Sequence, residues 1–241
     1  MSEKEKGCTP FGVSLFRTTE GKRVAIPLRC GKNSCPFCMT TKGRKAFARV
    51  MLRGAMSLDV PLAMTFTFRY TPGMEYSSKC WNRLRLSLKR KTGMESYFRA
   101  REFQSRGSRH EHVIAWCKEA PDGDELKKLT KSLAINAGYG WRTDAVRVSN
   151  LAGISAYAAK YVTKAAGGAY SPGERPFSFS RDFPKLESNW TWEGTYMTDS
   201  DLPADLRIVF DWCIIRMAGE GNAWEAFARL LTERSNDDGM A

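Results

Sequence analysis

The sequence has no run of about 18 consecutive apolar residues, the minimum for a helix that spans a bilayer, so we expect no membrane segment. Residues 1–6 are mostly charged and lack the apolar core of a secretion signal. These two absences predict a protein that works in a reducing cytoplasm. Its seven cysteines would then be thiols or metal ligands rather than disulfides.

Acidic side chains are scarce in the part of the chain from Lys42 to Arg109. This stretch has sixteen Lys and Arg against four Asp and Glu, whereas the chain from Asp182 to its end has five basic and twelve acidic residues. The formal net charge is +12. A surface so rich in one sign indicates a polyanionic partner, because a phosphate backbone rewards basic contacts with counterion release. We therefore expect the first half of the chain to bind nucleic acid.

Histidine is rarer still, since the chain has only His110 and His112, one residue apart. Alternate residues of a strand point to the same face, so both imidazoles can reach one point in space. Convergent imidazoles are typical ligands of divalent metals. The alternative is that one ring lies on the surface and the other in the core. The adjacency of the pair in a chain so poor in histidine favours the metal site.

Cysteines concentrate in residues 1–40, where strand-like alternation at residues 12–16 and 23–28 predicts a hairpin. The four cysteines of this segment are Cys8, Cys30, Cys35 and Cys38. Four thiolates ending in a C-x2-C motif fit a tetrahedral structural zinc, which would stabilise a segment too short for its own core. The C-x2-C motif is also compatible with a redox pair, and Cys8 with a free thiol.

Hydrophobic periodicity predicts an α+β domain over residues 41–170. Alternation predicts strands at residues 60–68, 96–103, 110–117 and 145–148. Helical spacing predicts helices at residues 43–52, 76–91, 125–137 and 154–164. From residue 60 onward the order β-α-β-β-α-β-α favours a central antiparallel sheet with flanking helices, in the ferredoxin-like or RNA-recognition-motif style. Residues 171–241 are expected to be a C-terminal extension, a loop followed by helices at 203–217 and 222–234.

The last helix of the predicted domain carries the motif Y-x-x-K-Y-x-x-K. Its four residues are Tyr157, Lys160, Tyr161 and Lys164. Residues four apart lie on one helix face, so the two phenols share a face and the lysines form an adjacent stripe. Such a face would be unusual in a core, and it favours a catalytic or binding role.

The strand with hydroxyls at Thr65 and Thr67, the histidine pair and the two-tyrosine helix occur in an order that resembles the HUH endonucleases. The resemblance is to the replication initiator (Rep) proteins of rolling-circle phages and plasmids, in their two-tyrosine form. It covers about residues 30–168 and includes a cysteine-rich lead-in. It implies a ferredoxin-like HUH fold and an enzyme that nicks and rejoins DNA.

Glu111 departs from the family pattern, which has a hydrophobic residue between the two histidines. Its side chain points to the face opposite the histidines, which is normally packed. We expect Glu111 to lie at the exposed start of the strand, since Val113 and Ala115 resume the apolar pattern.

The resemblance also implies a third metal ligand from the preceding strand, for which Glu102 is the candidate. The set His110, His112 and Glu102 would hold Mg²⁺ or Mn²⁺ and leave positions open for phosphate oxygens. The alternative is that Glu102 pairs with the neighbouring arginines.

By the same resemblance, Tyr157 attacks the origin strand first and Tyr161 acts second, assisted by Lys160 and Lys164. The attack gives a 5′-phosphotyrosyl link and a free 3′-OH, so the protein would initiate and terminate rolling-circle replication. Alternatives are a transposase or relaxase, or a non-enzymatic zinc-dependent nucleic-acid-binding protein whose histidines share a metal with Cys80 or Cys117.

The expected partner is single-stranded DNA at a replication origin in a bacterial host cell. The predicted basic helix would contact phosphates through Arg83, Arg85, Lys89, Arg90 and Lys91. Bases could stack on Tyr97, Trp116 or Trp81, although Trp81 fits the core better. The chain has no Walker-type G-x-x-x-x-G-K-[S/T] motif, so a host helicase would unwind the DNA and a host polymerase would extend it.

Overall fold

The computed structural model describes residues 8–56, 59–103, 109–166, 170, 174–186, 190–216 and 222–237. The chain divides into two compact units. The larger is Met39–Leu186, and the smaller combines Met1–Cys38 with Glu187–Ala241. Among the helices in the described ranges, none is long and apolar enough to cross a membrane.

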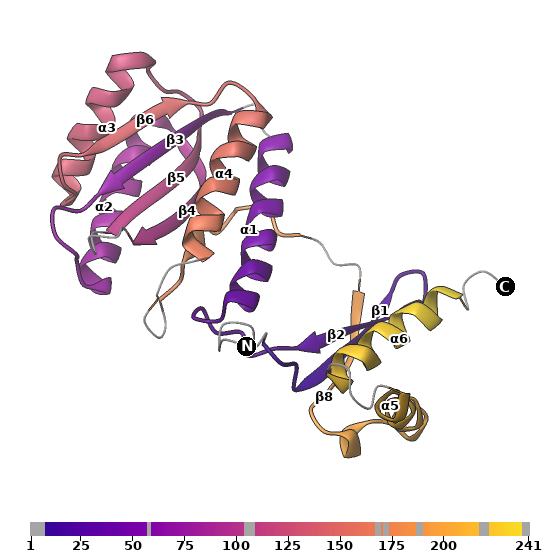
Figure 1. Cartoon of the computed structure of the whole chain (residues 1–241). Coiled ribbons are helices and arrows are strands. Elements are labelled where there is room, and N and C mark those ends of the chain that lie inside the picture. Colours follow the sequence, from indigo (N-terminus) through magenta and orange to yellow (C-terminus); the bar gives the residue numbers. More distant parts are fainter. Residues whose placement is uncertain are drawn as a thin grey trace. The chain divides into compact units, whose positions relative to one another are not determined.

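The larger unit is a five-stranded antiparallel sheet in the order β6-β3-β5-β4-β7. The strands are β3 (Val60–Thr67), β4 (Met94–Phe103), β5 (Arg109–Cys117), β6 (Thr143–Arg147) and β7 (Phe177–Phe179). The helices are α1 (Pro36–Met56), α2 (Met74–Thr92), α3 (Gly123–Ala137) and α4 (Leu151–Ala166). Helices α2 and α3 cover one face of the sheet, and α1 and α4 cover the other (Figure 1). The predicted α+β architecture is confirmed.

Each face of the sheet has its own core, because alternate residues of a strand point in opposite directions. The core under α2 and α3 is built around Met64, Phe66, Trp81, Leu84, Val113 and Ala115. The core under α1 and α4 is built around Val50, Phe98, Ile114, Trp116, Ala158 and Val162. Strand β5, at the centre of the sheet, therefore contributes its even-numbered residues to the α1–α4 face and its odd-numbered residues to the α2–α3 face.

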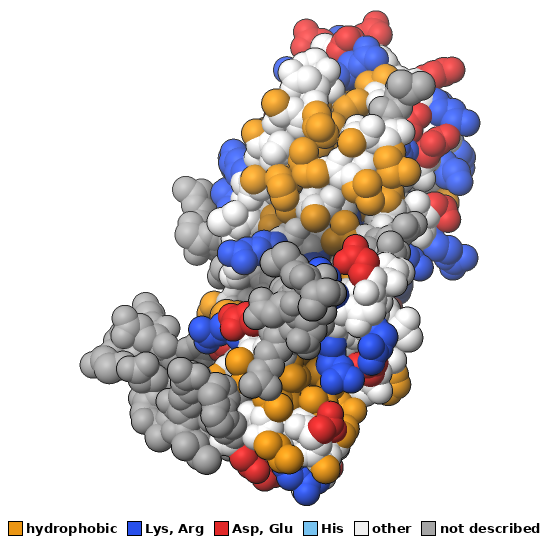
Figure 2. All heavy atoms as spheres, turned by 90° about the vertical axis from the view of Figure 1, so that its right-hand side faces the viewer, with side chains coloured by type: hydrophobic (Ala, Val, Ile, Leu, Met, Phe, Trp, Pro, Cys, Tyr) orange, Lys and Arg blue, Asp and Glu red, His pale blue; other side chains and the backbone are white. Residues whose placement is uncertain are grey.

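Helices α1 and α4 approach closely at Gly43, where an added Cβ would lie 2.9 Å from Val162. A shallow groove runs between the two helices, lined in part by Phe47, Val162 and Thr163. Figure 2 views the larger unit from the side that carries α1 and α4, and shows apolar side chains gathered on this face. The small residue at Gly43 thus fixes how α4 is held against the sheet.

The smaller unit is a three-stranded antiparallel sheet in the order β2-β1-β8, with two helices and a short 3-10 turn. Its elements are β1 (Gly12–Thr18), β2 (Arg23–Leu28), β8 (Trp190–Tyr196), η2 (Asp199–Asp201), α5 (Ala204–Arg216) and α6 (Ala223–Asp237). Its core contains Leu15, Phe210 and Phe227. The hairpin and the two C-terminal helices agree with the sequence prediction. The added strand β8 pairs with β1, so segments about 180 positions apart share one sheet.

Candidate active site

The two histidines lie on β5 between β3 and β4. In the strand register His112 is opposite Thr65, while His110 is opposite Thr67 on one side and Glu102 on the other. Directly paired residues of antiparallel strands share a face, so all five side chains belong to the face that α4 covers. The imidazole centroids are 6.1 Å apart.

Glu102 contacts both a histidine and a lysine of the predicted site. Its Oε2 lies 2.8 Å from His112 Nε2, and Lys164 Nζ donates to its Oε1 at 2.9 Å. Burial raises the pKa of Glu102, but the bonds from Lys164 and His112 outweigh burial and hold the pKa below its ordinary value. Glu102 is therefore an ionised acceptor, linked to α4 and β5 at the same time.

His112 is held on both ring nitrogens. Its Nδ1 lies 3.1 Å from the Thr65 hydroxyl, so the contacts are satisfied when Nε2–H donates to Glu102 and Thr65 donates to Nδ1. Burial lowers the pKa of His112 to about 4, and burial also lowers the pKa of His110. Both rings are therefore neutral near pH 7, the form in which imidazole binds metals. Sequence reasoning assigned no role to Thr65, although its place in the alternating Thr65–Thr67 pattern marked it.

Helix α4 brings both tyrosines to the histidines. The ring of Tyr161 stacks on His112 with centroids 3.4 Å apart, and the two tyrosine rings are 4.5 Å apart. The hydroxyl of Tyr157 donates to Met64 O at 2.8 Å and lies 3.3 Å from Thr65 Oγ1. Burial raises the pKa of Tyr157, so this phenol is protonated at neutral pH. The helix face expected from the motif thus faces the histidine strand.

The two lysines of the motif differ in what they reach. Lys164 bonds to Glu102, whereas Lys160 lies with its Nζ 5.3 Å from the ring centroid of Tyr161. Lys164 is at a similar distance from that ring, 5.6 Å. Tyr161 therefore has two cations beside it, and one of them is also joined to the acidic member of the site.

The donor set of the histidine site suits a divalent metal. Two neutral imidazoles and a carboxylate lie on one sheet face, and this combination leaves positions open for phosphate oxygens. Glu102 and His112 are at hydrogen-bond distance, so a bound ion would replace the proton between them. Among the described residues, the ligand atoms of at least three side chains converge only in the cysteine cluster, not here. The chemistry of His110, His112 and Glu102 fits, and their side chains would have to regroup around the ion.

Glu111 is fully buried on the α2–α3 face, and the expectation that it lies at an exposed strand start was wrong. Ser77 Oγ donates to it at 2.9 Å, Arg99 donates at 3.4 Å, and the Tyr139 hydroxyl donates as well. Arg101 adds a second cation, at 3.8 Å. A buried carboxylate is tolerated when it is paired and hydrogen-bonded, and these four side chains supply both.

The four N-terminal cysteines form a cluster in the smaller unit, as predicted. The sulfur atoms of Cys8, Cys30, Cys35 and Cys38 all lie within 4.8 Å of one another. The Sγ of Cys8 is 3.8 Å from that of Cys38, so Cys8 is a member of the cluster rather than a remote thiol. Such a set of four thiols can hold a metal such as zinc.

Local backbone geometry assembles this cluster. Arg29 donates to the carbonyl of Cys8, and the Cys30 amide donates to Cys8 Sγ at 3.4 Å. A hydrogen bond from the Cys38 backbone lowers the pKa of Cys35 to about 7, while burial raises the pKa of Cys38 to about 12. One thiol is thus readily ionised and another resists ionisation, until a cation is bound beside it.

The predicted phosphate-binding residues lie on α2, with Leu84 and Leu88 buried beneath them. Arg83, Lys89, Arg90 and Lys91 are exposed, and Arg85 is half-buried. Helix α2 packs on the sheet face opposite the histidines. These side chains form a basic surface, but not on the face that carries the tyrosines.

Two of the aromatic residues considered for base stacking are core residues. Trp81 and Trp116 are buried, one in each core, so neither ring is available to a base. Cys80 and Cys117 are buried on the α2–α3 side. They therefore lie on the wrong face to share a metal with the histidines, which removes the basis of the non-enzymatic alternative.

Residues 61–166 match a family model described as a replication-associated protein of the ORF2 type. The match begins in β3 and ends with α4, so it includes both histidines, Glu102 and the complete two-tyrosine motif. Comparisons with curated proteins and with solved structures gave no match. The matched region carries the resemblance that the motifs implied, and this part of the chain belongs to the replication-associated protein family, a family of rolling-circle replication initiators.

Proposed function

We propose that the protein is an HUH endonuclease that nicks one DNA strand at a replication origin and becomes joined to it through tyrosine. Membership of the replication-associated family supports a role in replication initiation. The stacking of Tyr161 on His112, with Tyr157 and Glu102 beside it, is the observation that carries the chemical part of the proposal. No other group of described residues combines phenols, imidazoles, a carboxylate and an ammonium group on one face.

In this proposal His110, His112 and Glu102 hold Mg²⁺ or Mn²⁺. The ion supplies Lewis-acid polarisation of the scissile phosphate when it is bound. Thr65 fixes the ring orientation of His112, as groups beside metal-binding histidines commonly do. Lys164 holds Glu102 in place and adds positive charge where a phosphate would lie.

The nucleophilic step uses a phenol oxygen. The oxygen loses its proton and forms a bond to phosphorus, the bond from phosphorus to the 3′ oxygen breaks, and that oxygen takes up a proton. The products are a 5′-phosphotyrosyl link and a free 3′-OH that can prime synthesis. A phenol is weakly nucleophilic while protonated, so the site must lower its pKa.

We assign Tyr157 to the first cleavage and Tyr161 to the second. Burial raises the pKa of Tyr157, so attack by this residue requires that its hydroxyl leave Met64 O and meet the positive charge of the site. Tyr161 already lies beside Lys160 and Lys164. With two phenols on one helix face, one can hold the parental strand while the other cuts the newly made junction, which would end a round of replication.

The remaining proposals concern binding. The cysteine cluster would hold a structural zinc, and the basic surface of α2 would contact phosphates away from the cleavage site. A host helicase and polymerase would act on the nicked origin.

The test is a nicking assay on supercoiled plasmid that carries the native origin, with Mg²⁺ or Mn²⁺ supplied. The expected result is a relaxed circle with protein attached at the 5′ end. Relaxation without a covalent adduct, or no relaxation with either ion, would remove the proposal.

A further inference from the structure

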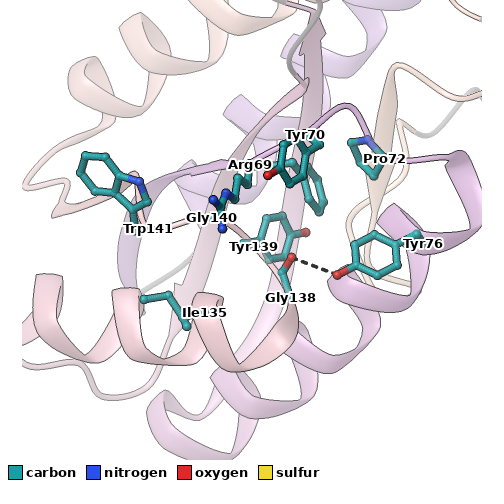
Figure 3. Close-up of a pocket in the computed structure, with 10 residues that line it drawn as sticks. Arg69, Tyr70, Pro72, Tyr76, Ile135, Gly138, Tyr139, Gly140 and Trp141 are labelled. Carbon is teal, nitrogen blue, oxygen red and sulfur yellow. Dashed lines mark hydrogen bonds between the residues drawn. The ribbon is translucent and has the colours of Figure 1, made fainter.

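A pocket of about 470 Å³ lies where the chain leaves β3, within the range of roughly 300–1,000 Å³ typical of ligand sites (Figure 3). The loop that follows α3 forms part of its wall. The Gly140 amide donates to Thr67 O at 2.8 Å, and a Cβ at Gly140 would lie 2.9 Å from that oxygen. Gly138 has φ +104°, a conformation that favours glycine. The two glycines therefore let this loop cross the end of β3 and close the pocket on one side.

The lining is largely aromatic. Phe68 and Tyr139 are buried and stack with centroids 4.4 Å apart. Tyr76 forms another wall and donates to Gly138 O at 3.4 Å, as the dashed line in Figure 3 marks. Tyr70 and Trp141 are 71% and 63% exposed, which leaves large apolar rings in water. Aromatic faces exposed around one pocket suit a flat, unsaturated occupant that can stack on them.

The charge around the pocket has one sign. Arg69 lies 5.3 Å from the ring of Tyr70, and Arg142 lies 5.2 Å from the ring of Trp141. Lys131 is 5.9 Å from the same tryptophan ring. None of the ten residues that line the pocket is acidic. A flat occupant that carries negative charge nearby fits both observations, and a nucleotide within a DNA strand has this chemistry.

The pocket adjoins the histidine end of the sheet. Phe68 follows directly after Thr67, which pairs with His110, and the Phe68 amide donates to Arg109 O at 3.3 Å. Arg142 is near enough to His110 to act on it electrostatically. A strand that passes the histidines can therefore place a neighbouring base here without a long excursion.

We propose that this pocket binds one unstacked base of the single-stranded DNA substrate, by stacking on Trp141 and Tyr70, with Arg69 and Arg142 on the adjoining phosphates. The inference rests on the proposed function. It adds a site that holds the strand in place beside the cleavage centre, built from residues outside the metal and tyrosine set. Stacking tolerates every base, so the pocket would add affinity with little sequence preference.

The test compares two single-stranded probes of about 20 nucleotides, one of thymidines and one with abasic sugars throughout, by fluorescence anisotropy without Mg²⁺ or Mn²⁺. Wild-type protein should prefer the probe that has bases. Trp141→Ala should weaken thymidine binding by between about fivefold and a hundredfold and leave abasic binding unchanged. Trp141→Phe should restore most of the loss. Trp192→Ala, which removes an exposed tryptophan of the smaller unit, is the matched control and should change neither affinity.

The proposal is overturned if Trp141→Ala weakens both probes equally, or neither, while circular dichroism shows a folded protein. A nicking assay on the origin plasmid is run with the same wild-type preparation. If nicking is absent but the base preference and its loss in Trp141→Ala hold, the proposed function fails and the pocket stands. If nicking occurs and Trp141→Ala binds like wild type, only the pocket fails.

Discussion

The ring of Tyr161 lies almost flat on the ring of His112, with 16° between the planes and 3.4 Å between the centroids. This contact joins α4 to the central strand at the position where the sequence places its rarest residue type. A substitution that keeps the ring and removes the hydroxyl therefore separates the chemical role of Tyr161 from its packing role.

The first prediction concerns the two tyrosines. Tyr157→Phe should lose most of the initial cleavage of a single-stranded origin oligonucleotide, because the assigned nucleophile is gone. Tyr161→Phe should still cut, but should fail to rejoin strands efficiently, and the double variant should form no adduct. Peptide mapping of trapped protein–DNA adducts measures this. Thr163→Ala, a change on an exposed position of α4, is the control. Adducts on Tyr161 alone would reverse the proposed order, and adducts on neither tyrosine would end it.

The second prediction concerns the histidines. His110→Ala and His112→Ala should each reduce nicking by about a hundredfold or more, since metal polarisation contributes several kcal/mol to such reactions. Binding of single-stranded DNA should be largely retained, because phosphate contacts supply most of the affinity. Nicking rate and anisotropy on the same preparations check both parts. Wild-type nicking by the double variant would contradict the metal assignment.

The third prediction concerns the cysteine cluster. Freshly purified protein should contain about one zinc per chain, and Cys35→Ser or Cys38→Ser should lose it. The Cys80→Ala variant removes a thiol outside the cluster and should keep the metal. Metal analysis by mass spectrometry gives the stoichiometry. A folded, metal-free wild-type protein that nicks DNA would show that the cluster needs no zinc.

The fourth prediction concerns the buried carboxylate. Glu111→Ala should destabilise the protein by about 3–5 kcal/mol, because it leaves Arg99 and Arg101 buried without their partner. The matched change at an exposed ion pair, Glu75→Ala beside Lys79, should have no measurable effect. Urea unfolding of the two variants gives the comparison. Equal stability of the two would mean that water or another group solvates the arginines.

The fifth prediction concerns alkaline pH. Burial raises the pKa of Tyr139 well above its ordinary value. Above about pH 10 the unfolded chain gives up this proton while the folded chain keeps it, so stability is complete below that pH and falls as pH rises. The loss can reach about 1.4 kcal/mol per pH unit for this group. Thermal unfolding at pH 9 to 11 should show a smaller alkaline loss for Tyr139→Phe than for wild type, whereas Tyr70→Phe, at an exposed ring, should behave as wild type.

Much of the site could be predicted because its signals are local. His110 and His112 are two residues apart on a strand, and Tyr157 and Tyr161 are four apart on a helix, so each pair is placed by the period of its own element. Glu111 could not be placed in this way. Its burial depends on Arg99 and Arg101 from β4 and on Tyr139 from beyond α3, and no local pattern reveals such partners. The aromatic pocket was missed for a similar reason, since Tyr70 and Trp141 meet only when the loop after α3 crosses the end of β3.

The pairing of β1 with β8 has a consequence for how the protein is made. During synthesis the larger unit has all of its strands once β7 has left the ribosome. Strands β1 and β2 emerge first, yet they form a stable sheet only when residues 190–196 become available. The domain that carries the histidines and tyrosines can therefore fold while the ribosome is still at work, whereas the sheet that carries the cysteine cluster is completed only after the whole larger unit has been made.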